Sequence, residues 1–210
     1  MEPKFWREKW ASNQIGFHEE IFHELMCEHW VPFVVDCTAR VFVPLCGKSR
    51  DMLWLRERGH EVVGVEVSDI AVAAFLQENG LIAQRDEFGR FSRYRGEGYT
   101  LLCGDIFDLT PEILGPFAAF YDRAALIALP PETRQAYAAR MQSLCAEKTH
   151  GLLITIDYPP DEVSPPPFLV PREEVQTLYG PWCEVTLVGV GDTQVKGVAA
   201  SHNAYSLRVI

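Results

Sequence analysis

The feature that most constrains this chain is a strand–turn–helix–strand unit over residues 41–66. Its first strand is apolar and β-branched, and it turns at Gly47 into a helix that Ser49 is expected to cap. The second strand is almost continuously apolar, as in a parallel strand that is covered on both faces. It ends in Glu66, 19 residues after Gly47, where nucleotide-binding α/β folds hold a ribose.

The single glycine of this turn narrows the choice of nucleotide. A dinucleotide site needs three glycines around its pyrophosphate, and a phosphate loop needs an upstream glycine that the stretch Gly47-Lys48-Ser49 lacks. NAD and ATP are therefore disfavoured, and a nucleoside without phosphates fits better. A carboxylate that accepts hydrogen bonds from two vicinal hydroxyls makes charge-assisted contacts, so Glu66 is the candidate residue for binding the ribose.

The rest of the chain continues the alternation of strands and helices. This pattern predicts one α/β domain over residues 1–210, built on a doubly wound, mostly parallel sheet with an antiparallel pair of closing strands. Residues 84–98 are expected to form a loop or a hairpin. Further helices are predicted over 68–79, 132–146 and 171–179, and further strands over 99–103, 117–121, 151–156, 183–190 and 204–210.

Polar residues follow several of these strands. In open α/β sheets ligands bind at the carboxyl ends of strands, which here carry Asp105-Ile106, Asp122-Arg123 and Asp157-Tyr158. Asp122 and Arg123 have two interpretations, a structural ion pair or a fixed cation that faces an electron-rich substrate atom. The aromatic residues Trp6, Trp10 and Phe17, taken alone, predict a helix stripe packed on the core.

The charge balance excludes some classes of partner. The 210 residues carry 19 lysines and arginines against 29 acids, which disfavours a binder of nucleic acid. No apolar run reaches the length of a membrane helix, and no signal-peptide pattern opens the chain. Six scattered cysteines predict reduced thiols in a cytoplasmic protein, and neither they nor the acidic and histidine-bearing stretch 20–29 has the spacing of a metal site. We therefore expect a monomer that binds a small molecule and no metal.

Several sequence blocks together resemble one family. The chain is similar to the thiopurine S-methyltransferases of bacterial type, within the class I methyltransferases that use S-adenosylmethionine. The blocks that carry this resemblance are residues 5–18, 41–48, 63–66, 103–107, 121–130, 157–159 and 166–171.

The resemblance implies a Rossmann-like sheet of seven strands with a reversed last strand, and a helical cap over the active site formed by residues 1–35. It places S-adenosylmethionine against Leu45 and Gly47, with its ribose on Glu66 and its adenine near Asp105 and Ile106. Trp6, Trp10 and Phe17 would close over the cofactor and the substrate, with Trp10 among the cofactor contacts. Arg123, with Asp122, would lie beside cofactor and acceptor, and the turn that carries Pro167 and Phe168 would wall the substrate pocket.

The activity that this resemblance implies is methyl transfer from S-adenosylmethionine to the sulfur of an aromatic thiol such as a thiopurine, with S-adenosylhomocysteine (SAH) as product. Other acceptors stay open, namely tellurite or selenium species, halides and small thiols, as does a non-catalytic protein that binds S-adenosylmethionine. The sequence departs from the family after about Val188, because the segment 189–203 is shorter than is usual in the family and is rich in small residues. This difference predicts a more open pocket.

Overall fold

The computed structural model describes residues 3–30 and 38–210. The chain divides into two compact units. The first contains residues 3–23 and 38–117, and the second contains residues 24–30 and 118–210.

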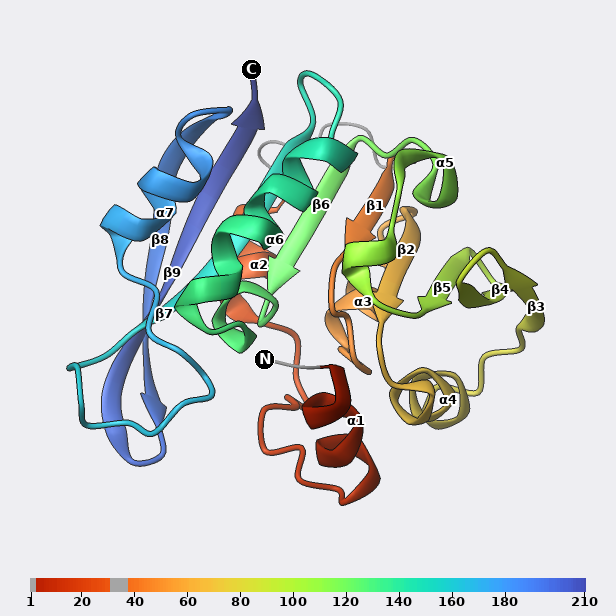
Figure 1. Ribbon diagram of the computed structural model, residues 1–210, viewed down its shortest axis with the longest axis horizontal. Helices are drawn as coiled ribbons and strands as arrows, with labels where there is room; N and C mark the ends of the chain where they lie inside the picture. Colours follow the sequence, from red (N-terminus) through yellow and green to blue (C-terminus); the bar gives the residue numbers. More distant parts are fainter. Residues whose placement is uncertain (1–2, 31–37) are drawn as a thin grey trace. The chain divides into compact units, whose positions relative to one another are not determined.

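The first unit is built on strands in the order β3-β4-β5-β2-β1 (Figure 1). Its inner strands are parallel, with Val41 of β1 opposite Val62 of β2 and Val63 opposite Thr100 of β5. A hairpin of β3 and β4 continues the sheet in antiparallel pairing. The strands are β1 (Arg40–Val43), β2 (Glu61–Glu66), β3 (Gln84–Phe88), β4 (Phe91–Gly96) and β5 (Tyr99–Cys103).

The two helix caps that the sequence predicts in the first unit differ in outcome. The predicted cap at Ser68 is confirmed, because its Oγ accepts from the N–H of Ala71 at 3.4 Å. The cap predicted at Ser49 is wrong in its position: α3 begins at Asp51, and Ser49 accepts from the Asp51 N–H at 3.2 Å. The helices are α1 (Pro3–Ala11), α3 (Asp51–Glu57), α4 (Asp69–Glu78), α5 (Pro111–Leu114) and the 3-10 turn η1 (Ile106–Asp108).

The second unit has the strand order β6-β7-β9-β8. β6 and β7 are parallel, whereas β9 runs antiparallel to both β7 and β8. In Figure 1 α6 and α7 lie on the near face of these strands and α2 lies behind them. The elements are α2 (Glu24–His29), β6 (Ala119–Arg123), η2 (Leu126–Ala128), α6 (Pro131–Leu144), β7 (His150–Asp157), α7 (Arg172–Tyr179), β8 (Cys183–Val195) and β9 (Val198–Val209).

The predicted fold class is confirmed, with parallel strands inside each unit and an antiparallel closing strand. The predicted count of seven strands is too low, because the residues that the structure describes contain nine. The additional pair is the β3–β4 hairpin, at the place where a loop or hairpin was expected. β6 also lies two residues later than predicted, so Asp122 and Arg123 belong to the strand instead of following it.

The closing hairpin is longer than the sequence pattern indicates. Its strands were expected to stop at 190 and restart at 204, but pairing continues to Val195 opposite Val198. Lys196 and Gly197 form the turn, with φ of 50° and 85°, the paired left-handed conformations of a tight hairpin. The small residues at 189–203 lack the apolar, β-branched pattern that predicts a strand, but strand pairing uses the backbone and needs no large side chain.

Helix α2 falls in the second unit, where it contacts β7, β8 and β9. The expected helical cap of residues 1–35 is thereby divided, and its last residues, 31–35, lie outside the described part of the chain. Among residues 3–30 and 38–210, no helix has both the length and the apolar character needed to cross a membrane.

The pairing of Gly151 with Phe120 gives a test of packing in the second unit. A Cβ at Gly151 would overlap the ring of Phe120, which is fully buried. We therefore expect Gly151→Ala to lower the free energy of unfolding by about 1–3 kcal/mol, the usual cost of overpacking. Gly16→Ala is the matched control, since a Cβ at residue 16 meets nothing within 4 Å. Denaturant unfolding measures both variants, and equal midpoints would contradict this account.

Candidate active site

Glu66 lies at the carboxyl end of β2 and is 6% exposed. Its Oε2 accepts from the N–H of Gly47 at 2.9 Å, and its Oε1 accepts from the N–H of Ser68 at 2.9 Å. One carboxylate therefore ties the loop after β1 to the start of α4.

The environment of this carboxylate combines burial with hydrogen bonding. Burial raises the pKa of Glu66, and the backbone N–H groups of Ser68, Gly47 and Val67 oppose that change. A carboxylate offers about four lone-pair sites. Each oxygen of Glu66 therefore keeps capacity for a further donor, as binding to the two hydroxyls of a ribose requires.

Gly47 is held by its backbone and by a neighbouring ring. Its φ is 52°, and Cζ2 of Trp10 lies 3.1 Å from the position that a Cβ would take at residue 47. Leu45 also has a positive φ, 45°, a strained conformation of the kind that clusters at binding sites. The Lys48 ammonium donates to both carboxylate oxygens of Glu78, at 2.7 and 2.9 Å, in keeping with the rejection of a phosphate loop.

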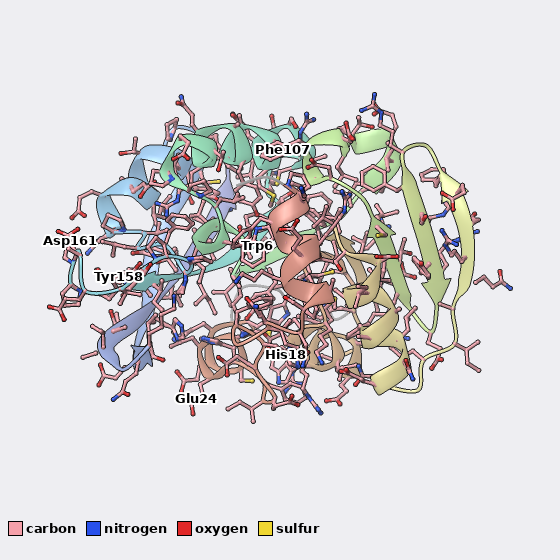
Figure 2. The ribbon with its side chains drawn as sticks, turned by 60° about the horizontal axis from the view of Figure 1, so that its bottom comes forward. Trp6, His18, Glu24, Phe107, Tyr158 and Asp161 are labelled. Carbon is pink, nitrogen blue, oxygen red and sulfur yellow. The ribbon has the colours of Figure 1, made fainter. Side chains whose placement is uncertain are left out.

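Helix α1 brings the N-terminal aromatics to the same unit as Glu66. The rings of Trp6 and Trp10 each meet Phe17 edge-on, at centroid distances of 5.4 and 5.5 Å. Arg7 donates to the carbonyl of Val67 at 3.2 Å and so fixes α1 to the end of β2. Figure 2 shows Trp6 on α1. The Nε1 of Trp6 is buried and has no partner in the part of the chain that the structure describes.

Asp105 and Ile106 follow β5, the strand beside β2 on which Cys103 pairs with Glu66. Oδ1 of Asp105 accepts from the Phe107 N–H at 2.9 Å and begins the turn η1. Ile106 is 5% exposed. The first unit thus brings together Glu66, Gly47 and the three N-terminal aromatics, with Asp105 and Ile106 one strand away.

Asp122 is fully buried in the second unit. Its Oδ2 accepts from the Tyr137 hydroxyl at 2.6 Å, and its Oδ1 accepts from the Leu126 N–H at 3.4 Å. Burial raises the pKa of Asp122 to about 6, although these hydrogen bonds oppose the increase. Its carboxylate is enclosed in the interior of this unit, and a role for Asp122 beside the acceptor stays a prediction. Its observed contacts join the end of β6 to η2 and to α6.

Arg123 is the last residue of β6 and is partly exposed. Successive residues of a strand point to opposite faces, so the guanidinium of Arg123 leaves the face on which Asp122 is buried. The bond from Tyr137 to Asp122 fixes the end of β6 and, with it, the backbone that carries Arg123.

The turn that carries Pro167 and Phe168 follows β7 and contains cis peptide bonds before Pro166 and Pro167. The Phe168 N–H donates to the carbonyl of Ile127 at 2.7 Å. The Arg134 guanidinium lies 5.8 Å from the Phe168 ring centre and donates to the Leu169 carbonyl at 3.0 Å.

Sequence reasoning missed Arg134 and Tyr137 as supports of this region. Both lie on the buried face of α6, at helical spacing with Ala138 and Met141. An arginine on an otherwise apolar helix face is a detectable signal, because a buried guanidinium requires partners. Arg134 has them in Glu174, at 2.6 Å, and in two carbonyls. In residues 3–30 and 38–210, no group of three or more histidine, cysteine and acidic side chains is arranged to hold a metal ion.

Comparison with solved structures supports the fold. The structure matches magnesium protoporphyrin IX methyltransferase from Synechocystis, solved with bound SAH, at a TM-score of 0.67 and 13% identity. The match covers 99% of this chain and 100% of that one. At this level of identity the similarity shows the class I methyltransferase fold.

Comparison with sequences identifies the family. The family Thiopurine S-methyltransferase matches residues 1–208. A thiopurine S-methyltransferase of Methylococcus capsulatus is 45% identical over 99% of this chain and 98% of its own length. One from Pseudomonas aeruginosa strain UCBPP-PA14 is 48% identical over 87% of this chain and 84% of its own. The chain therefore belongs to the thiopurine S-methyltransferase family.

Proposed function

We propose that this protein transfers a methyl group from S-adenosylmethionine to the sulfur of an aromatic or heterocyclic thiol of the thiopurine class. The observation that carries the proposal is the buried Glu66 carboxylate, bonded to the amides of Gly47 and Ser68 at the end of β2. Membership of a family of thiol methyltransferases supports the reaction type.

The residues of the first unit fit the donor. Glu66 offers free acceptor capacity for the ribose hydroxyls, and the turn at Leu45 and Gly47 presents backbone with no phosphate-binding glycine nest. Asp105 and Ile106 follow the neighbouring strand β5, where the family resemblance places the adenine. Trp10 places an aromatic ring against Gly47, and the faces of aromatic rings attract the positive charge of a sulfonium. When bound, S-adenosylmethionine supplies a methyl group that is activated by a sulfonium leaving group.

In the proposed reaction the acceptor thiol displaces the thioether from the methyl group of S-adenosylmethionine. A bond forms between the acceptor sulfur and the methyl carbon, the bond from that carbon to the sulfonium breaks, and a neutral thioether leaves. The thiol proton passes to water, since aromatic thiols are acidic enough to ionise near neutral pH. Nearby positive charge lowers a thiol pKa, so Arg123 favours the reactive thiolate. Positioning accounts for much of the acceleration.

The cysteines bear on the expected location of the protein. Cys27, Cys46, Cys103, Cys145 and Cys183 are free thiols, which supports a reducing compartment such as the cytoplasm. A small-molecule acceptor agrees with the fold, whereas the monomeric state stays a prediction.

A panel of acceptors tests the reaction. The purified protein and S-adenosylmethionine are incubated with a bicyclic heteroaromatic thiol, thiophenol, a small alkyl thiol, iodide, tellurite or selenite, and SAH is quantified. We expect the heteroaromatic thiol to have the highest kcat/KM, with one methyl thioether formed per SAH. Tight binding of SAH without turnover of any acceptor would reject catalysis. Preference for iodide, tellurite or selenite would reject the thiol assignment.

Arg123→Ala tests the role of the guanidinium. We expect kcat/KM for the aromatic thiol to fall about 10–100-fold, the value of a hydrogen bond to a charged group. Without the positive charge the bound thiol ionises at higher pH, so the acidic limb of the pH–rate profile should move upward. Arg172→Ala removes an exposed arginine of the same unit and should leave both quantities unchanged.

The binding of SAH separates this role from a contribution to cofactor affinity. Titration calorimetry on Arg123→Ala should give a dissociation constant close to that of the unmodified protein. A loss of SAH affinity equal to the loss of kcat/KM would assign Arg123 to the cofactor instead of the acceptor.

A further inference from the structure

The hydroxyl of Tyr158 holds the backbone on both sides of Phe168. Tyr158 follows β7 directly and lies on the same segment as Asp161 (Figure 2). Its hydroxyl donates to the carbonyl of Pro167 at 2.8 Å and accepts from the N–H of Leu169 at 2.9 Å. A single oxygen therefore fixes the two peptide groups that flank Phe168.

The ring of Tyr158 is itself held by the tip of the closing hairpin. Tyr158 is 7% exposed and packs in an apolar cluster with Val163 and with Val195, the last residue of β8. Val198, the first residue of β9, packs against the same cluster. Lys196, in the turn between these strands, donates to the carbonyl of Ser164. The extended hairpin thus supports the proline-rich segment, where a short and open segment was expected.

Phe168 is constrained on its remaining sides. Its own N–H donates to the carbonyl of Ile127 at 2.7 Å. Arg134, which is 1% exposed and paired with Glu174, lies by its ring and bonds the next carbonyl along the chain. Backbone hydrogen bonds at residues 167, 168 and 169 therefore fix the main chain that carries the ring, and the Arg134 guanidinium lies beside the ring itself.

We propose that Tyr158 is a positioning residue that sets acceptor specificity by fixing the ring of Phe168. The inference rests on the proposed function and on the family resemblance, which places Phe168 in the wall of the acceptor pocket. A fixed ring binds a flat bicyclic acceptor without first losing conformational freedom, because the protein has already ordered it. The affinity for a small acceptor that does not reach the ring should not depend on whether the ring is fixed. Loss of the hydroxyl should therefore weaken binding of large aromatic thiols selectively.

Tyr158→Phe tests the hydroxyl, and Tyr179→Phe is its matched control. The Tyr179 hydroxyl is also buried in the second unit and has no hydrogen-bond partner in the described part of the chain. For Tyr158→Phe we expect KM for a bicyclic heteroaromatic thiol to rise about tenfold, the combined effect of losing the two hydrogen bonds that this hydroxyl makes. The KM for a small alkyl thiol and the affinity for SAH should stay within about twofold. Tyr179→Phe should change neither KM.

Two further measurements separate positioning from general loosening. In a double-mutant cycle with Phe168→Ala, removal of the Tyr158 hydroxyl should have no further effect on KM once the ring is gone, because coupled residues are non-additive. Amide hydrogen exchange of Leu169 should accelerate in Tyr158→Phe and not in Tyr179→Phe.

The outcomes that overturn the inference are specific. Equal rises of KM for the bicyclic and alkyl thiols, or effects that multiply in the cycle, would mean that Tyr158 does not act through Phe168. An unchanged bicyclic KM in an active Tyr158→Phe enzyme would reject the inference alone. An unmodified protein that methylates no thiol would instead reject the proposed function, and this inference with it.

Discussion

The two hydrogen bonds of the Glu66 carboxylate are the interactions on which the first unit's candidate binding surface depends. The carboxylate accepts one backbone amide from the loop after β1 and one from the start of α4, and so sets the distance between these two loops. Burial makes its charge costly unless it is hydrogen-bonded, so the loops must keep their amides directed at it. The left-handed turn at Gly47 and the Trp10 ring against it follow from this arrangement.

Much of this surface is predictable from the sequence because it is local in the chain. The apolar run of β2, the acid at its end and the cap at Ser68 follow from periodicity and from short-range chemistry. The N-terminal aromatics are different, since their place is fixed by the Arg7 bond to Val67 and by ring contacts between helix α1 and Phe17. Such contacts depend on tertiary packing and have no signature in residue spacing. Only the family resemblance predicted a role for these rings.

In the second unit, too, the closing hairpin could not be predicted fully from the sequence. The small and polar residues at 189–203 have the composition of a loop, yet they continue β8 and β9 to a tight turn. Val195 and Val198, on either side of that turn, pack on the segment around Tyr158. The burial of Asp122 against Tyr137 was hidden in a similar way, because a carboxylate at a strand end is usually exposed. In both cases the buried contact is made with another element of the fold, Tyr158 after β7 or Tyr137 on α6, so residue spacing does not reveal it. Whether a side chain is free to contact a ligand or instead holds a neighbouring residue in place depends on these tertiary contacts.

The affinity for SAH and for its 2′,3′-dideoxy analogue, measured by titration calorimetry, tests the role of Glu66 most directly. If the carboxylate binds the ribose, removal of both hydroxyls should weaken binding to the unmodified protein by about 10–100-fold, as for lost hydrogen bonds to a charged group. Glu66→Gln, which keeps the side-chain shape, should bind SAH more weakly and discriminate little between the two ligands. Equal affinities of the unmodified protein for SAH and its dideoxy analogue would contradict the assignment.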